Sequence, residues 1–212
     1  MSYFKVFGLC LLVILSACSS KPTLSPEAST SALEQAGLKG NVSTNFAKAV
    51  DLIKQTDVSK EDLIKAKDIL LAINDSHPEY LGPIINLGII EVKAKRLKEA
   101  KLYFQQIIDF DSEGEGSLKS QQMTIASLNY LGVIAREEGM FDEAESYYKK
   151  VLALDKDNQS ALRNLAILLD LYRGRLDEAL VLYEQYQNLQ TEPVPKVKDW
   201  IFDIKSRIKS GN

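Results

Sequence analysis

Cysteine and histidine, the side chains most used in nucleophilic and zinc chemistry, are scarce in this chain. The 212 residues include two cysteines, Cys10 and Cys18, and a single histidine, His77. Metal sites and catalytic triads need several such groups brought together, and His77 has no second histidine as a partner. It stands next to Pro78 in "DSHPEY", a context typical of a turn. We therefore expect no catalytic residue and no resident cofactor.

One acidic stretch, "DFDSEGEGSLKS", has the spacing of a calcium loop. Asp109, Asp111 and Glu113 stand at alternate positions, and Gly114 stands where such a loop turns sharply. The twelfth position, where calcium loops carry a bidentate glutamate, is Ser120. Without that ligand calcium would bind weakly. We interpret the stretch as an acidic turn and expect no metal site.

Other charged and glycine-containing stretches exclude further classes of function. Acid pairs such as Glu137 and Glu138 lie on the polar sides of helical patterns, and nothing places two carboxyls across a cleft as in glycosidases. The glycines of "EGEGS" lack the Lys-Ser/Thr that completes a phosphate loop. The net charge of −3 argues against nucleic acid, which needs a basic face. We expect neither an enzyme nor a protein that binds nucleic acid or a small-molecule substrate.

The first residues have the layout of a secretory signal that ends at a cysteine. Lys5 supplies a positive charge, and residues 6–15 form an apolar run of about ten residues, shorter than the roughly 20 of a membrane-spanning helix. The following "LSAC" resembles the lipobox of bacterial lipoproteins. This resemblance implies that residues 1–17 are removed, and that Cys18 is lipidated on its thiol and acylated on its new amino group. An ordinary signal peptide with a chance cysteine is the alternative.

The lipobox also indicates where the protein resides. Cys10 would be removed and Cys18 capped, which leaves no thiol for a disulfide or a nucleophile in an oxidising compartment. Several acyl chains anchor a protein firmly. Ser19 is not aspartate, and by the sorting rule of enteric-type lipoproteins this implies the outer membrane, with the folded part facing the periplasm. Removal of residues 1–17 changes the net charge to −4 because Lys5 is lost.

A polar segment follows the lipobox. Residues 18–45 are rich in Ser, Thr, Pro and Gly, as "SSKPTLSPEASTSALEQAGLKGNVST" shows. This composition predicts a flexible tether. A coil of about 25 residues spans on the order of 25–30 Å, so the tether would let the folded part stand off the membrane.

Helical periodicity dominates the chain after the tether, and one pattern of residues recurs along it. Four alanines are spaced 34, 44 and 35 residues apart: Ala66, Ala100, Ala144 and Ala179. Each is followed four residues later by a large apolar or aromatic residue: Leu70, Phe104, Tyr148 and Tyr183. Gly88 and Gly132 stand twelve residues before the second and third alanines. Spacings of this kind indicate stacked helical repeats.

These residues resemble the tetratricopeptide repeat, a helix–turn–helix unit of 34 residues. Leu-Gly pairs at 87–88 and 131–132 strengthen the resemblance, whereas the first unit is degenerate. The resemblance implies an all-α fold, a right-handed α-solenoid of about four repeats whose stacking buries the core. The repeats cover residues 46–193, in units 47–80, 81–114, 125–158 and 159–193.

Two segments lie outside the repeat pattern. Residues 194–212 are predicted to form a C-terminal capping helix that begins at Pro195. One apolar stripe of this helix would face the repeats, and we interpret Trp200 as cap packing. The stripe contains Val197, Trp200, Ile201, Ile204 and Ile208. The ten extra residues 115–124 nearly keep helical phase with the next unit, so we expect them to lengthen its first helix.

In the tetratricopeptide repeat family, the first helices of the units line a concave groove through repeat positions 2, 5, 9, 12 and 13. The resemblance implies a groove with an apolar floor in the middle and polar and basic side chains farther along. Its residues would be Ile85, Ile89, Val92, Asn129, Val133, Arg136, Arg163, Ile167 and Asp170. The family's carboxylate clamp has lysine at position 5, which is lysine in none of the units here. We expect the groove to hold a segment of a partner protein. The convex face, the insertion and the C-terminal helix are alternative binding surfaces.

The anchor and the repeats together resemble the repeat lipoproteins that serve type IV and related pili, where they help to assemble or place secretins. This resemblance implies a non-catalytic scaffold that binds partner proteins in the cell envelope, attached to the membrane through its lipid. Similar repeat proteins accompany energy-coupling inner-membrane systems or serve as adaptors for cell-wall enzymes, and no motif selects among them. An enzyme acting on peptidoglycan and a purely structural spacer are the remaining alternatives.

Overall fold

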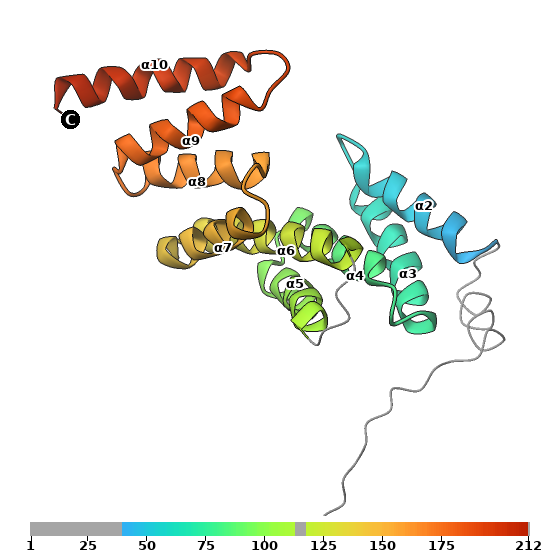
Figure 1. Ribbon diagram of the computed structural model, residues 1–212. Helices are drawn as coiled ribbons and strands as arrows, with labels where there is room; N and C mark the ends of the chain where they lie inside the picture. The colour runs from blue at the N-terminus through green and yellow to red at the C-terminus, as the bar shows by residue number, and fades with distance from the viewer. Residues whose placement is uncertain (1–39, 113–117, 212) are drawn as a thin grey trace, which may run out of the picture.

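The computed structural model describes residues 40–112 and 118–211, and these residues form helices joined by short turns (Figure 1). The helices are α2 (Val42–Lys54), α3 (Lys60–Ser76), α4 (Leu81–Lys93), α5 (Leu97–Ser112), α6 (Leu118–Glu137), α7 (Phe141–Leu154), α8 (Gln159–Leu171), α9 (Leu176–Asn188) and α10 (Pro195–Ser210). No helix in these two ranges is both long and apolar enough to cross a membrane. The predicted signal peptide, Cys18, most of the tether, and Glu113 and Gly114 of the acidic stretch lie outside the described residues.

The helices pair in chain order into hairpins. Helix α2 packs on α3, α4 on α5, α6 on α7 and α8 on α9, and α10 packs on α9. Successive hairpins then stack, because α3 contacts α4, α5 contacts α6 and α7 contacts α8. Figure 1 shows the resulting curved array, with α2 near one end and α10 at the other. The all-α solenoid of stacked hairpins that the sequence predicted is confirmed.

Short-range hydrogen bonds set where several helices begin. The side chain of Asn41 accepts a hydrogen bond from the backbone N–H of Thr44 at 2.9 Å, and Ser59 accepts one from Asp62 at 3.0 Å. Both are N-cap interactions, which satisfy amides that have no partner inside the helix. Because Asn41 caps α2, this helix begins at Val42, inside the segment predicted as tether and ahead of the predicted first unit.

The residues that defined the repeat form the core of each hairpin. The four periodic alanines are fully buried, as are Leu70, Phe104 and Tyr148, and Tyr183 is 1% exposed. In the second and third hairpins, the aromatic ring of the repeat pattern lies directly on a glycine of the partner helix. A Cβ atom added at Gly88 would lie 2.7 Å from Phe104 Cε1, and one at Gly132 would lie 2.5 Å from Tyr148 Cε1. Only glycine allows the two helices to approach this closely.

Residues 118–124 of the insertion and the C-terminal segment form helices. Helix α6 begins at Leu118 and is 20 residues long, so residues 118–124 supply its first turns. In α10, Val197 and Ile204 are buried against the last hairpin. The ring centroid of Trp200 lies 5.4 Å from that of Tyr183, so Trp200 is part of the cap packing.

We predict that Gly132→Ala lowers the free energy of unfolding by about 1–3 kcal/mol, the usual cost of overpacking a core. Alanine has a higher helix propensity than glycine, by about 1 kcal/mol. The free energy of unfolding therefore falls only if the clash of the new methyl group with Tyr148 costs more than this gain. Urea unfolding measures the difference. Adding Tyr148→Leu should recover part of the loss by making room for the methyl group.

The control is Glu143→Ala, a substitution at an exposed residue of α7. It should change the free energy of unfolding by less than about 0.5 kcal/mol. A Gly132→Ala protein as stable as the wild type would show that the Tyr148 ring does not limit the approach of α6 and α7.

Candidate functional site

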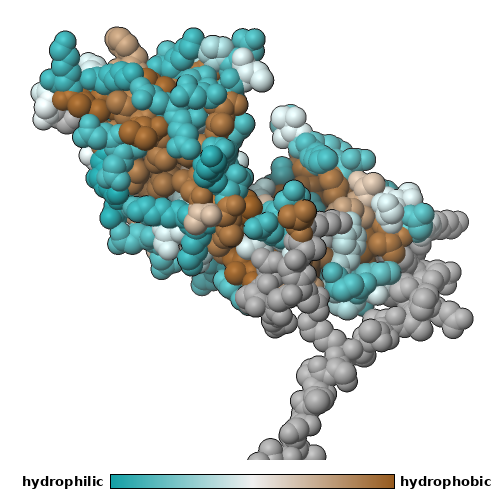
Figure 2. All heavy atoms as spheres, in the orientation of Figure 1, coloured by the Kyte–Doolittle hydropathy of each residue, from teal (hydrophilic) through white to brown (hydrophobic). Residues whose placement is uncertain are grey.

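The first helices of successive hairpins form one continuous surface. Helix α4 contacts both α2 and α6, and α6 contacts α8. Figure 2 shows that the molecular surface is hollowed between the end formed by α8–α10 and the end formed by α2 and α3. The repeat pattern predicted a groove along these first helices.

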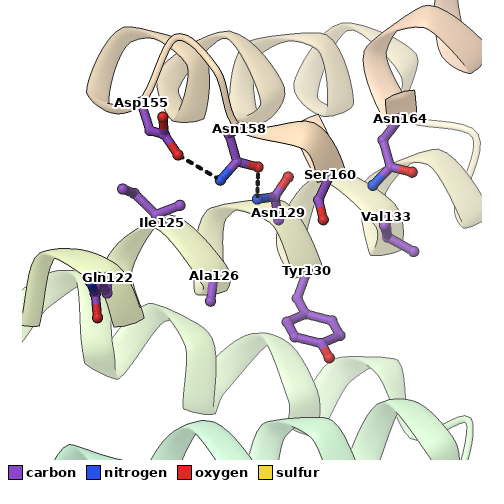
Figure 3. Close-up of a pocket in the computed structure, with 10 residues that line it drawn as sticks. All are labelled: Gln122, Ile125, Ala126, Asn129, Tyr130, Val133, Asp155, Asn158, Ser160 and Asn164. Atoms are coloured by element: carbon purple, nitrogen blue, oxygen red, sulfur yellow. Dashed lines mark hydrogen bonds between the residues drawn. The ribbon is translucent and has the colours of Figure 1, made fainter. Parts of the chain in front are cut away.

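A pocket of about 480 Å³ opens on this surface between α6 and α8 (Figure 3). Aliphatic side chains of α6 form one side of it: Ile125, Ala126 and Val133. Polar side chains from α6, from the turn after α7 and from α8 form the rest: Gln122, Asn129, Asp155, Asn158, Ser160 and Asn164. Tyr130, also in the lining, stacks on Phe104 with ring centroids 4.8 Å apart. The lining is therefore apolar and rich in amides, with Asp155 as its one charged residue.

Three polar side chains of the pocket form a hydrogen-bonded chain (Figure 3). Asn129 Nδ2 donates to Asn158 Oδ1 at 3.1 Å, and Asn158 Nδ2 donates to Asp155 Oδ2 at 3.0 Å. The same Asn158 Oδ1 accepts a hydrogen bond from the backbone N–H of Ala161 at 3.1 Å and caps α8. Asn129 Oδ1 is buried and has no hydrogen-bond partner among the described residues.

The structure places the predicted groove residues in different environments. Asn129 and Val133 line the pocket. The isoleucines and the valine of α4 are half-buried and pack against core residues of the neighbouring helices, so the expected apolar floor belongs partly to the core. These residues are Ile85, Ile89 and Val92. Ile167 is likewise half-buried against the last hairpin.

The two arginines predicted to line the groove form no ion pair among the described residues. Arg163 is exposed on α8 between Ser160 and Asn164 of the pocket, and Arg136 is half-buried at the end of α6. Neither has an ion-pair partner in the described part of the chain. Burial raises the pKa of Tyr148 to about 12, and the nearby positive charge of Arg136 partly opposes this rise.

The prediction for Asp170 is wrong. Its side chain is buried, and Arg207 Nη1 of α10 lies 2.7 Å from Asp170 Oδ1. The hydrogen bond that Arg207 donates to Asp170 raises the pKa of Arg207. Asp170 therefore joins α8 to the capping helix instead of facing a partner. The repeat pattern could not show this, because Arg207 lies outside the repeats.

Sequence reasoning did not name several pocket residues. Ala126 and Ser160 occupy repeat position 2, so the family pattern could have identified them. The pattern gave no signal for Asn158 and Asn164, since the inter-repeat turn and position 6 are not among the groove positions.

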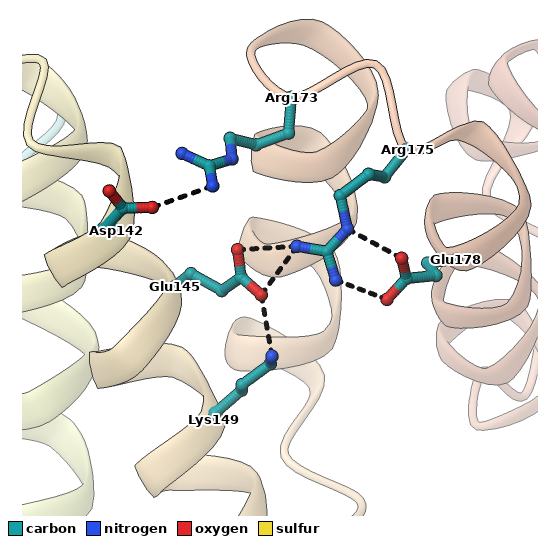
Figure 4. A network of polar contacts seen from close by, with 6 residues as sticks. All are labelled: Asp142, Glu145, Lys149, Arg173, Arg175 and Glu178. Carbon is teal, nitrogen blue, oxygen red and sulfur yellow. Dashed lines mark hydrogen bonds and ion pairs between the residues drawn. The ribbon is translucent and has the colours of Figure 1, made fainter.

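A second polar cluster lies between α7 and the α8–α9 turn, and it could be mistaken for an anion site (Figure 4). Arg175 Nη1 lies 2.8 Å from both carboxylate oxygens of Glu145, and Lys149 Nζ lies 2.7 Å from Glu145 Oε1. Arg175 also pairs with Glu178, and Arg173 pairs with Asp142 at 2.8 Å. Each of these cations already has a carboxylate partner. Because the pairs connect α7 with the α8–α9 turn, the cluster holds the third hairpin against the fourth.

The first two hairpins are joined in a similar way. Glu91 of α4 is fully buried and accepts a hydrogen bond from Lys67 of α3 at 2.7 Å. It also forms an ion pair with Arg96 in the turn after α4. These clusters are structural, and no group of three or more metal-binding side chains occurs in the parts of the chain that the structure describes.

Comparisons with known proteins give the same fold. Residues 135–198 match the family model described as tetratricopeptide repeat. No curated protein matches the sequence. Among solved structures, the C-terminal TPR-containing domain of a Plasmodium falciparum FK506-binding protein matches with a TM-score of 0.54 and 19% identity, over 65% of this chain and 94% of that chain. MamA of AMB-1 matches with a TM-score of 0.53 and 17% identity, over 79% and 82% of the two chains. At these identities the structural matches show the fold alone.

The ion pairs of Glu145 with Lys149 and Arg175 make the free energy of unfolding depend on pH. Burial alone would raise the pKa of Glu145, but hydrogen bonds and charges from Lys149 and Arg175 outweigh it and lower the pKa below the ordinary 4.5. The ionised carboxylate therefore stabilises the folded state above about pH 4.5, and this contribution is lost as the pH falls through the lowered pKa.

We predict that Glu145→Gln lowers the free energy of unfolding at pH 7 by about 1–2 kcal/mol, because charged hydrogen bonds are lost. The difference from the wild type should shrink towards pH 3. Urea unfolding at the two pH values measures it. Glu143→Gln, an exposed change on the same helix, should show no pH-dependent difference. A Glu145→Gln difference that stays constant with pH would contradict the role assigned to the carboxylate.

Proposed function

We propose that this chain is a lipid-anchored scaffold that binds partner proteins during the assembly or operation of a complex in the cell envelope. Proteins built from tetratricopeptide repeats generally act as scaffolds for protein interactions. The observation that carries the proposal is the pocket between α6 and α8, which lies on the surface formed by the first helices and contains Asn129 and Val133.

The chemistry of the groove suits a protein partner better than a reaction. Aliphatic and amide side chains line the pocket, a combination that binds peptide segments. The titratable side chains in the lining are Asp155 and Tyr130. The lining therefore contains no pair of groups suited to act as general acid and general base. We propose a non-catalytic role without a cofactor other than the lipid on Cys18.

The proposed anchor is Cys18 in "LSAC". The first described helix begins at Val42, so more than 20 residues would separate the lipid from the repeats. That spacing would let the groove reach partners near the membrane surface. With Ser19 after the cysteine, we assign the protein to the outer membrane, facing the periplasm.

Among envelope complexes we favour those of the pilus or secretion type. This choice rests on the resemblance of anchor and repeats together to the lipoproteins of those systems. It identifies no individual partner.

We predict that Arg163→Glu abolishes a specific crosslink between this protein and a partner. Arg163 is exposed beside the pocket and has no ion pair within the described residues, so reversing its charge should leave the fold intact. Crosslinking in intact cells, followed by mass spectrometry of the co-purified proteins, measures the loss. Lys150→Glu, an exposed charge reversal on α7, is the control and should retain the crosslink. Recovery of the same proteins with both variants would argue against the groove, and recovery of none with the wild type would argue against a scaffold.

We predict that Cys18→Ser releases the protein from membranes or blocks its maturation, because serine has no thiol to lipidate. Fractionation of inner and outer membranes, with immunoblotting of each fraction, measures the change. Cys10→Ser, which lies in the segment expected to be removed, should leave the distribution as in the wild type. If Cys18→Ser still fractionates with the outer membrane, the lipobox interpretation is wrong.

A further inference from the structure

We propose that the outer side of α10 binds an anionic phospholipid surface, with Phe202 inserted among the lipid headgroups and the lysines beside it contacting their phosphates. The inference rests on the proposed lipid anchor and adds a second membrane contact at the other end of the array. It accounts for an exposed aromatic residue on a helix whose other exposed residues, apart from Pro195 at its start, are polar.

Helix α10 packs against the array on one side only. It contacts α9 through the side that contains Val197 and Ile204, and Figure 1 shows no described helix on its other side. The terminal helix of a repeat array normally presents a polar outer side to water. Phe202 departs from this rule, because its side chain is 78% exposed.

The charge of α10 is opposite to that of the whole chain. Residues 195–210 contain five cations and two carboxylates, a net charge of +3, whereas the net charge of the chain is −3. Lys198, Phe202, Lys205 and Lys209 follow one another at spacings of four, three and four residues. Residues at these spacings share one face of a helix. Positive charge therefore lies beside the exposed aromatic ring.

Two of these lysines are free to bind an anion. Lys198 and Lys209 are exposed and form no ion pair among the described residues. Lys205 Nζ lies 2.6 Å from Glu184 Oε1 of α9. Both side chains of that pair are exposed to water, so the pair is weak, and a lipid phosphate can compete with it.

The carboxylates of α10 lie on the other side of Phe202 around the helix. They are Asp199 and Asp203, and Arg207 Nη1 lies 3.3 Å from Asp203 Oδ2. The basic and acidic residues are thus separated around the helix. An anionic surface can approach Phe202 from the lysine side without meeting an unpaired carboxylate first.

A membrane fits this surface better than a second copy or an acidic protein. Two copies that met through the same face of α10 would bring like charges together. Lysines beside an aromatic residue are typical of helices that bind at lipid interfaces, and anionic lipids attract lysine. An acidic protein would match the charge as well, but the proposed anchor places lipid near α10 at a high effective concentration.

The position of α10 gives this contact a consequence for the scaffold. The proposed tether leads into α2, and α10 lies at the opposite end of the array (Figure 1). A single attachment through a flexible tether lets the array rotate freely. With a second contact at α10, the array would lie along the membrane in one orientation.

The test uses the full chain with its lipid, reconstituted into vesicles of phosphatidylcholine alone or mixed with the anionic phosphatidylglycerol. Trp200 is the only tryptophan, but it packs against Tyr183. Trp200→Phe combined with Phe202→Trp moves the only indole to the proposed contact. Bromine atoms on the lipid acyl chains quench the fluorescence of an indole that enters the membrane.

We expect quenching in the anionic vesicles and little in phosphatidylcholine alone. Bromines near the headgroups should quench more strongly than bromines near the chain ends, because a helix at the interface inserts only its outer side chains. Raising NaCl from about 0.1 M to about 1 M shortens the screening length from about 10 Å to about 3 Å and should reverse the quenching. The control is Trp200→Phe with Leu102→Trp, which places the indole at an exposed apolar position on α5. Its quenching should not depend on phosphatidylglycerol.

In the chain with the indole at position 202, Lys198→Gln with Lys209→Gln should lower the ratio of quenched to unquenched protein about 25-fold. Each lysine near an anionic surface contributes about fivefold. The matched control is Lys98→Gln with Lys150→Gln, which removes two exposed lysines of α5 and α7 and should leave the ratio unchanged. Because glutamine is a good helix former and all four lysines are exposed, both variants should fold.

Flotation with phosphatidylcholine vesicles tests the anchor separately. A chain that does not float with them would refute the anchor, and quenching measured at a higher lipid concentration would still decide the contact of α10.

Three outcomes would overturn the inference: equal quenching with both lipid mixtures, quenching that NaCl does not change, or quenching that persists after the substitution of Lys198 and Lys209. Self-association without vesicles that the same substitutions abolish would assign the surface to a second copy instead. A protein crosslink lost with these substitutions, without quenching that depends on anionic lipid, would assign it to an acidic partner.

Discussion

The close approach of paired helices is the constraint on which the rest of the structure depends. Phe104 and Tyr148 lie directly on the backbone at Gly88 and Gly132, where a single added carbon would come within 3 Å of the ring. These contacts fix how α4 sits on α5 and how α6 sits on α7. The spacing between successive first helices, and with it the shape of the groove, follows from the stacking of these fixed pairs.

Buried carboxylates fix how neighbouring parts of the array sit on one another. Glu91, Glu145 and Asp170 each contact a cation from a different part of the array: Lys67 of α3, Arg175 before α9 and Arg207 of α10. Apolar packing alone tolerates small rotations between units, whereas a hydrogen-bonded ion pair has a preferred geometry. The pocket between α6 and α8 lies in the part of the array that is held by the Glu145–Arg175 and Asp170–Arg207 pairs.

The fold could be predicted because its signals are local and repeated. The alanine and aromatic residues recur at helical spacing, and each occupies a core position that any hairpin of this type requires. The groove was less predictable. Asn129 and Val133 follow from repeat position, but the environment of Asp170 depends on Arg207, 37 residues away. The start of α2 was missed because an N-cap at Asn41 outweighs the degenerate repeat pattern that follows it.

Asn158 has two tasks whose demands coincide. Its side-chain oxygen starts α8 by accepting from Ala161, and the same oxygen orients the Asn129 amide. Substitution at this position would therefore weaken the helix start and alter the pocket together. A change of binding preference that leaves stability intact has to arise at neighbours that cap nothing, such as Asn164 or Gln122. Because Asn158 also begins α8, the groove can change its binding preference without loss of stability only through residues other than Asn158.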